Sequence, residues 1–110
     1  MTRQRESTLV GKIARAVRAK YPAAYVRKLS DRHARGLPDL LIVLPILNVV
    51  DCNDQVIWPG TLFVEVKTSD GRLSPIQKAE HEKIRAAGAD VLVATEASKV
   101  LFWLEQMGAV

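Results

Sequence analysis

Three ionisable side chains in apolar surroundings are placed where they could act together. The stretch FVEVK, residues 63–67, alternates like a β-strand but carries Glu65 and Lys67 between its valines. Side chains two apart on a strand point to the same side of a sheet, so Glu65 and Lys67 are predicted to share one face. Asp39 opens the preceding apolar stretch, DLLIVL, directly after a GLP turn. If the two strands are neighbours, all three groups meet at one end of the sheet.

This set of groups indicates metal-assisted hydrolysis. Two neighbouring carboxylates repel each other, and a divalent cation relieves that repulsion. Oxygen ligands with little sulfur or imidazole nearby favour Mg²⁺ or Mn²⁺ over Zn²⁺. Lys67 could orient or help deprotonate an attacking water, while the metal offsets charge developing on a phosphodiester. The ordinary alternative is a solvated edge strand carrying Glu65 and Lys67, with Asp39 as a turn residue after proline.

Periodicity and turn signals outline the elements that must position these groups. Residues 6–20 predict an amphipathic helix, because Leu9, Ile13 and Val17 recur at every fourth position before Pro22 ends it. The remaining elements follow in the order strand, strand, strand, helix, strand, helix, predicted at residues 23–29, 39–44, 61–68, 75–87, 89–95 and 96–108.

Several turn signals set the boundaries of these elements. Pro45 is predicted to interrupt the second strand, and residues 46–60 to form a hairpin that turns near Asn53–Asp54 and ends at Pro59–Gly60. Ser74 and Gln77 have capping-box spacing around a proline at the first helical position. The predicted fold class is α/β with a mixed sheet flanked by helices, in which the third and fourth strands are parallel.

Composition limits the class of protein. With 110 residues, 48% hydrophobic and 25% charged, the chain is predicted to form one globular domain over residues 1–110. No apolar run reaches the about eighteen residues that a membrane span needs. A single cysteine, Cys52, excludes an internal disulfide and favours a cytoplasmic protein. Residues 1–35 hold ten Lys or Arg against two acids, which indicates a polyanionic partner or, alternatively, a solvated helix face and loop.

The residues around the acidic pair resemble a known nuclease motif. Pro38-Asp39 followed by Glu65-Val66-Lys67 is similar to the PD-(D/E)xK motif, and the element order is similar to the restriction-endonuclease-like αβββαβ core. The longer string GLPDLLIV … FVEVKTSDGRLSPIQKAEHEKIRAAGADVLVAT resembles the VRR-NUC domain, in which the Glu-x-Lys strand leads through a GRLSPxQ turn into a helix. The resemblance implies a nuclease.

The resemblance also implies roles for single residues. Asp39 and Glu65 would bind Mg²⁺ or Mn²⁺, with the backbone carbonyl of Val66 as a further ligand, and Lys67 would be the catalytic lysine. Gln77 matches the glutamine that the family places near its active site, although the capping box alone also explains its position.

Glu6, in the first helix, lies where many members of the superfamily carry an accessory metal-binding acid. The alternative for Glu6 is a first-turn acid that complements the helix dipole. The basic residues would contact DNA phosphates, which gives affinity and orientation rather than sequence readout; the candidates are Arg3, Arg5, Lys12, Arg15, Arg18, Lys20, Arg35 and Arg72.

Stand-alone members of this family resemble phage and bacterial Holliday-junction resolvases that act as homodimers. A four-way junction is two-fold symmetric, so two symmetric nicks need two active sites. The leading hypothesis is therefore a structure-selective, homodimeric DNA endonuclease, with the apolar residues of 46–58 and 100–107 as a candidate interface. A flap or fork nuclease is the second hypothesis, and a non-catalytic DNA-binding module is the third.

Other residues that draw attention are assigned ordinary roles. His33 is predicted to be a solvated loop residue, and His81 an exposed residue of the helix that carries the sequence EHEK. Cys52 is predicted to pack in the hairpin. Trp58 and Trp103 are assigned to a core or an interface rather than to stacking on bases.

Overall fold

The computed structural model describes residues 6–29, 35–49 and 55–110. Its elements are α1 (Glu6–Lys20), β1 (Tyr25–Lys28), β2 (Leu40–Val49), β3 (Gln55–Val66), α2 (Pro75–Ala86), β4 (Asp90–Ala94) and α3 (Ala97–Met107). Some predictions fall outside the described residues, namely those on Arg3, Arg5, His33, Cys52 and the turn at Asn53–Asp54.

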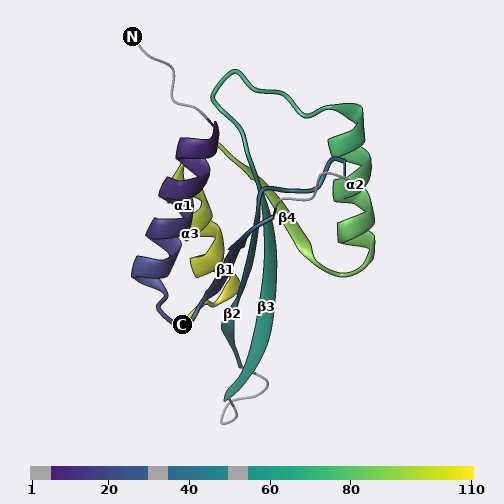
Figure 1. Ribbon diagram of the computed structural model, residues 1–110. Coiled ribbons are helices and arrows are strands. Elements are labelled where there is room, and N and C mark those ends of the chain that lie inside the picture. The colour runs from purple at the N-terminus through teal and green to yellow at the C-terminus, as the bar shows by residue number, and fades with distance from the viewer. Residues whose placement is uncertain (1–5, 30–34, 50–54) are drawn as a thin grey trace.

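The four strands form one mixed sheet in the order β1-β2-β3-β4 (Figure 1). β2 pairs antiparallel with β1 and with β3, whereas β4 runs parallel to β3, so that Glu65 lies opposite Val93. The parallel pair follows from its connection through a helix, because strands joined in this way return in the same direction. The predicted fold class, element order and parallel pair are confirmed.

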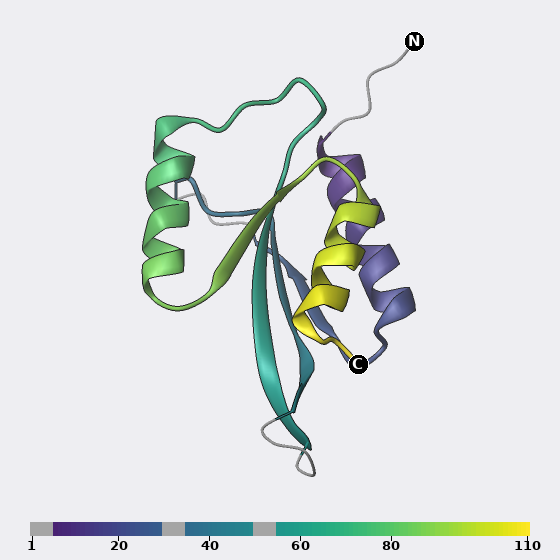
Figure 2. The ribbon, with the colours of Figure 1, turned by 180° about the vertical axis from the view of Figure 1, so that it is seen from behind.

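Helices cover the two faces of the sheet unequally. α1 and α3 lie side by side on one face, and α2 lies alone on the other (Figures 1 and 2). The core lies under the α1–α3 layer, where alternate residues of the two long strands are buried: Leu40, Ile42, Leu44, Ile46, Leu62, Val64 and Val66. Residues 41, 43, 45 and 47 on the opposite face of β2 are only half-buried. The α2 side of this strand is therefore covered less completely than the side under α1 and α3.

Two predicted strand ends are wrong. β2 continues through Pro45, and β3 continues through Pro59 and Gly60, with the two prolines opposite each other. The carbonyl of Pro45 accepts a hydrogen bond from the N–H of Val110, so the backbone of Pro45 points away from β3. The backbone nitrogens of the two prolines therefore point away from the β2–β3 ladder. β1 and β4 do not extend to these positions, so the absent N–H groups cost the sheet no hydrogen bond.

The predicted helices form for the reasons that the sequence indicates. Leu9, Ile13 and Val17 are buried along one side of α1. α2 begins with a complete capping box: the N–H of Gln77 donates to Ser74 Oγ at 3.1 Å, and the N–H of Ser74 donates to Gln77 Oε1 at 2.9 Å. Among the described residues, no helix combines the length and the apolar character required to cross a membrane.

Candidate active site

Asp39 is held at the end of β2 by three hydrogen bonds. Its carbonyl accepts from the N–H of Leu29 at 2.8 Å, and its own N–H donates to the Val64 carbonyl at 3.0 Å. The N–H of Val66 donates to Asp39 Oδ2 at 2.7 Å. In a strand, the N–H and C=O of one residue point to the same side, so the Val66 carbonyl also lies on the side of Asp39. The carboxylate and this carbonyl thus share one edge of β3.

Gly36 explains the turn that delivers Asp39 to this edge. Gly36 has a φ of +83°, and a Cβ built on it would lie 2.7 Å from the backbone oxygen of Ile76 in α2. Only glycine tolerates both the left-handed backbone and this approach. The turn is therefore packed directly on the first turn of α2, which fixes the distance between that helix and the start of β2.

Glu65 is buried on the face of β3 that α2 covers, with 2% of its surface exposed. The Asp39 side chain lies close enough to affect the pKa of Glu65. Burial first, and then the neighbouring Asp39 carboxylate, raise the pKa of Glu65 from 4.5 to about 8, although Lys67 acts in the opposite direction. Without a cation, Glu65 therefore keeps a proton at neutral pH. A cation placed between these two carboxyl groups would stabilise their ionised forms.

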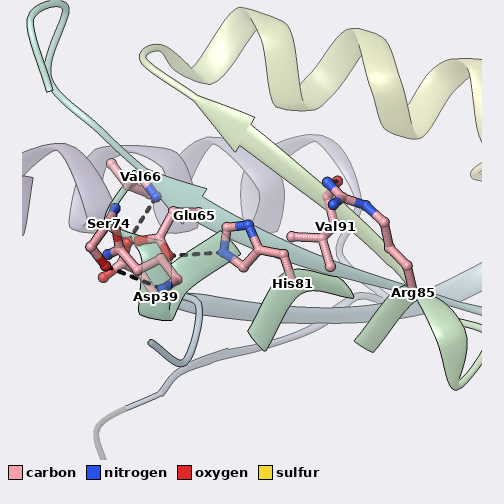
Figure 3. A network of polar contacts seen from close by, with 8 residues as sticks. Asp39, Glu65, Val66, Ser74, His81, Arg85 and Val91 are labelled. Atoms are coloured by element: carbon pink, nitrogen blue, oxygen red, sulfur yellow. Dashed lines mark hydrogen bonds and ion pairs between the residues drawn. The ribbon is translucent and has the colours of Figure 1, made fainter. Parts of the chain in front are cut away.

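His81 is buried, so the prediction that it is exposed is wrong. It lies in α2 with 1% of its surface exposed, and its Nε2 is 3.1 Å from Glu65 Oε1 (Figure 3). Burial, Arg85 and Lys67 all lower the pKa of His81. The imidazole is therefore neutral, and the contact is a hydrogen bond rather than an ion pair. The prediction failed because the exposed charged neighbours Glu82 and Lys83 make this part of the helix resemble a solvated face.

The other candidates lie around this centre in different ways. Glu6, at the start of α1, is exposed but close enough for its charge to contribute to the raised pKa of Glu65. The side chain of Gln77 is used in the capping box. Arg35 and Arg72 are exposed. The guanidinium of Arg18 donates to the carbonyl of Val26 at 2.9 Å, so this arginine ties α1 to β1.

A basic cluster lies where α1 approaches β1. Lys12 and Arg15 are exposed on α1, and Lys28 is exposed on β1, where it pairs with Leu40, the residue after Asp39. A Cβ built on Gly11 would lie 3.3 Å from Arg15 Nη1 and 3.7 Å from Lys28 Nζ, so cations of the two elements converge over Gly11. Lys28 was not among the sequence candidates, because a lone lysine in a short strand carries no motif.

The donor set fits a magnesium-type ion. Among the residues described, no three His, Cys, Asp or Glu side chains gather into a metal-holding group. Mg²⁺ does not need such a group, because it binds through one or two carboxylates and retains several waters. Asp39 and Glu65, with the Val66 carbonyl at the same edge, provide oxygen ligands of this kind. His81 is the only imidazole that contacts the pair among the described residues, so a zinc-type ligand set is not formed.

Comparisons with known proteins identify the family of this chain. The VRR-NUC domain family matches the chain over residues 2–97. The chain belongs to the VRR-NUC family. A solved structure described as a VRR_NUC domain is 33% identical, with a TM-score of 0.58 over 86% of this chain and 92% of that one. No curated protein matches the sequence. The VRR-NUC fold and a nuclease domain are thereby established, as the resemblance implied.

Proposed function

We propose that this VRR-NUC domain is a Mg²⁺- or Mn²⁺-dependent endonuclease that cleaves branched DNA, with the four-way junction as its favoured substrate. The observation that carries the proposal is the pairing of the Asp39 and Glu65 carboxyl groups at the end of β3, with Lys67 close enough to influence the pKa of Glu65. Buried acids with raised pKa values cluster at functional sites, because ordinary packing favours an apolar residue there.

The residues divide the chemistry between them. Asp39, Glu65 and the Val66 carbonyl would hold the cation, which supplies a Lewis acid for the charge that develops on the phosphate. The side chain of Lys67 leaves β3 on the same face as Glu65 and, in this proposal, orients the attacking water. Glu6 is proposed as an accessory acid on α1, and Gln77 as a residue that lines the site from its capping position.

The basic cluster of Lys12, Arg15 and Lys28 supports a DNA substrate. Phosphate contacts from such a cluster give affinity and orientation without reading the sequence. Lys28 pairs with Leu40, the residue after Asp39, and in this proposal a strand bound over the cluster continues toward the paired acids. This arrangement supports selection by DNA shape rather than by sequence, and in this proposal a branch point supplies the shape.

A homodimer would supply the second active site for paired nicks. Tyr25, Ile57 and Trp58 are each more than half exposed and line one hollow of about 360 Å³ with Pro45. Phe102 on α3 is 62% exposed. The apolar side chains around this hollow are typical of protein–protein contact. The patch lies on the sheet end opposite Asp39, so pairing through it would leave both sites open to DNA.

A cleavage panel tests the proposal. We expect four-way junctions to be cut into symmetric paired nicks in Mg²⁺ or Mn²⁺, while Asp39→Ala and Glu65→Ala bind the junction in Ca²⁺ but do not cut it. Lys67→Ala should lower the cleavage rate far more than the affinity. Full cleavage by either acid variant would refute the metal assignment, and cutting of flaps alone would replace the junction with a flap substrate.

A further inference from the structure

α2 packs on the sheet through a histidine. Of its twelve residues, only His81 is buried. Amphipathic helices normally bury a stripe of apolar side chains. A buried imidazole loses the hydration of its two nitrogens, and this loss is unfavourable unless the nitrogens find hydrogen-bond partners. What His81 contacts therefore decides why it is there.

His81 contacts one oxygen of one acid. Its Nε2 lies 3.1 Å from Glu65 Oε1, whereas its buried Nδ1 has no hydrogen-bond partner among the residues that the structure describes. A neutral imidazole carries one hydrogen, which can sit on either nitrogen. A buried N–H without an acceptor is costly, so the hydrogen resides on Nε2, where it donates to Glu65. The lone pair remains on Nδ1.

This donor divides the Glu65 carboxyl group into two unlike oxygens. The group lies between His81 on α2 and Asp39, the residue before β2 (Figure 3). The imidazole contacts Oε1, and Asp39 lies close enough to affect the pKa of the same carboxyl group. A hydrogen bond to one oxygen restricts rotation of the carboxylate about its last side-chain bond, so the same oxygen always faces Asp39.

We propose that His81 is a positioning residue, whose Nε2–H fixes Glu65 Oε1 so that the other oxygen faces the cation shared with Asp39. This inference rests on the proposed metal-dependent function. Hydrogen bonds to metal-binding carboxylates orient them, and loss of such a partner lowers metal affinity or activity by about 10–100-fold. His81 would act through Glu65 without touching the substrate.

The test compares variants that fill the site of His81 with and without a hydrogen-bond donor. His81→Phe fills the space but cannot donate, and His81→Gln restores an N–H donor. Binding of Mn²⁺ is measured by titration calorimetry and by the electron paramagnetic resonance signal of free Mn²⁺, and folding by urea unfolding. We expect His81→Phe to remain folded with Mn²⁺ affinity reduced about 10–100-fold, and His81→Gln to recover most of it. Ile84→Val, a half-buried change on the same helix, should leave the affinity unchanged.

The kinetic signature separates positioning from packing. With saturating Mn²⁺, loss of kcat should exceed any change in KM for DNA in His81→Phe, because the DNA contacts are intact. Equal Mn²⁺ affinity in His81→Phe and the wild type would overturn the role of His81. No Mn²⁺ binding by the wild type, or binding that survives Asp39→Asn, would instead overturn the proposed function.

A second measurement needs no variant. Long-range ¹⁵N spectra of the wild-type imidazole report which nitrogen carries hydrogen. We expect the neutral Nε2–H form of His81, and a change in its Nε2 shift when Mg²⁺ is added. A hydrogen on Nδ1, or an Nε2 signal indifferent to Mg²⁺, would refute the proposal even if His81→Phe fails to fold.

Discussion

Replacing Glu65 by glutamine should remove a pH dependence of stability in the metal-free protein. Glutamine resembles the neutral acid, can donate to Asp39 through its amide and can accept from His81 through its carbonyl. The pKa of Glu65 is raised from 4.5 to about 8 in the fold, chiefly by burial and by Asp39. Between these values the unfolded chain releases a proton that the folded protein keeps, so stability falls as pH rises.

The size of this effect follows from the two pKa values. The contribution of protonated Glu65 to the free energy of unfolding is fully present below pH 4.5 and is lost as the pH rises to about 8. Between about pH 5 and about pH 8, the wild type should lose roughly 3 kcal/mol of unfolding free energy that Glu65→Gln does not lose. Domains of this kind are stable by only about 5–15 kcal/mol, so the difference is large enough to measure.

Urea unfolding with a chelator present, followed by circular dichroism across this pH range, provides the assay. The control is Glu96→Gln, because Glu96 is exposed and its side chain makes no cap hydrogen bond to α3. It should retain the wild-type pH dependence. If Glu65→Gln and the wild type lose stability in parallel, Glu65 is ionised in the metal-free fold and the reasoning fails. Mn²⁺ should reverse the loss in the wild type and release a proton at neutral pH.

Three further predictions concern the scaffold and the DNA contacts. Gly36→Ala must accommodate a Cβ 2.7 Å from the Ile76 oxygen, and should cost roughly 2–3 kcal/mol in urea unfolding; an unchanged midpoint contradicts the packing of this turn. Ser74→Ala removes the cap of α2 and should cost about 1 kcal/mol by thermal melting; no change means that the cap is dispensable. Arg15→Gln should reduce the salt slope of DNA binding by about 1 with stability unchanged, whereas Arg18→Gln should mainly lower stability; the reverse pattern would place the DNA near Arg18.

The chemistry-bearing strand could be predicted because its signal is local. Alternation places Glu65 and Lys67 on one face of β3 and the flanking valines on the other, and this needs no knowledge of the partner strands. That Asp39 meets Glu65 follows from antiparallel pairing of consecutive strands. The sequence could not show the directions in which backbone groups point. Pro45 and Pro59 therefore predicted strand ends, although both lie within paired strands with their backbone nitrogens pointing away from the ladder.

The roles of the arginines could not be separated from the sequence for a similar reason. Arg15 and Arg18 occupy one basic helix, and each is exposed. Only the approach of β1 distinguishes them, because Arg18 reaches the carbonyl of Val26 while Arg15 lies with Lys28 over Gly11. Charge patterning predicts that a surface is basic, and tertiary contact decides which of its cations remain available to DNA.

The missed histidine belongs to a pattern that the sequence does contain. Gln77, His81 and Ile84 follow one another at helical spacing, and they are the buried or half-buried side of α2 together with Glu80. An inward stripe that is mostly polar is unsuited to a hydrophobic core, but it suits a strand face that carries a buried acid. α2 therefore covers Glu65 and supplies its hydrogen-bond donor, while α1 and α3 cover the core. A polar inward stripe after a Glu-x-Lys strand is the signal by which such a donor can be sought in other sequences.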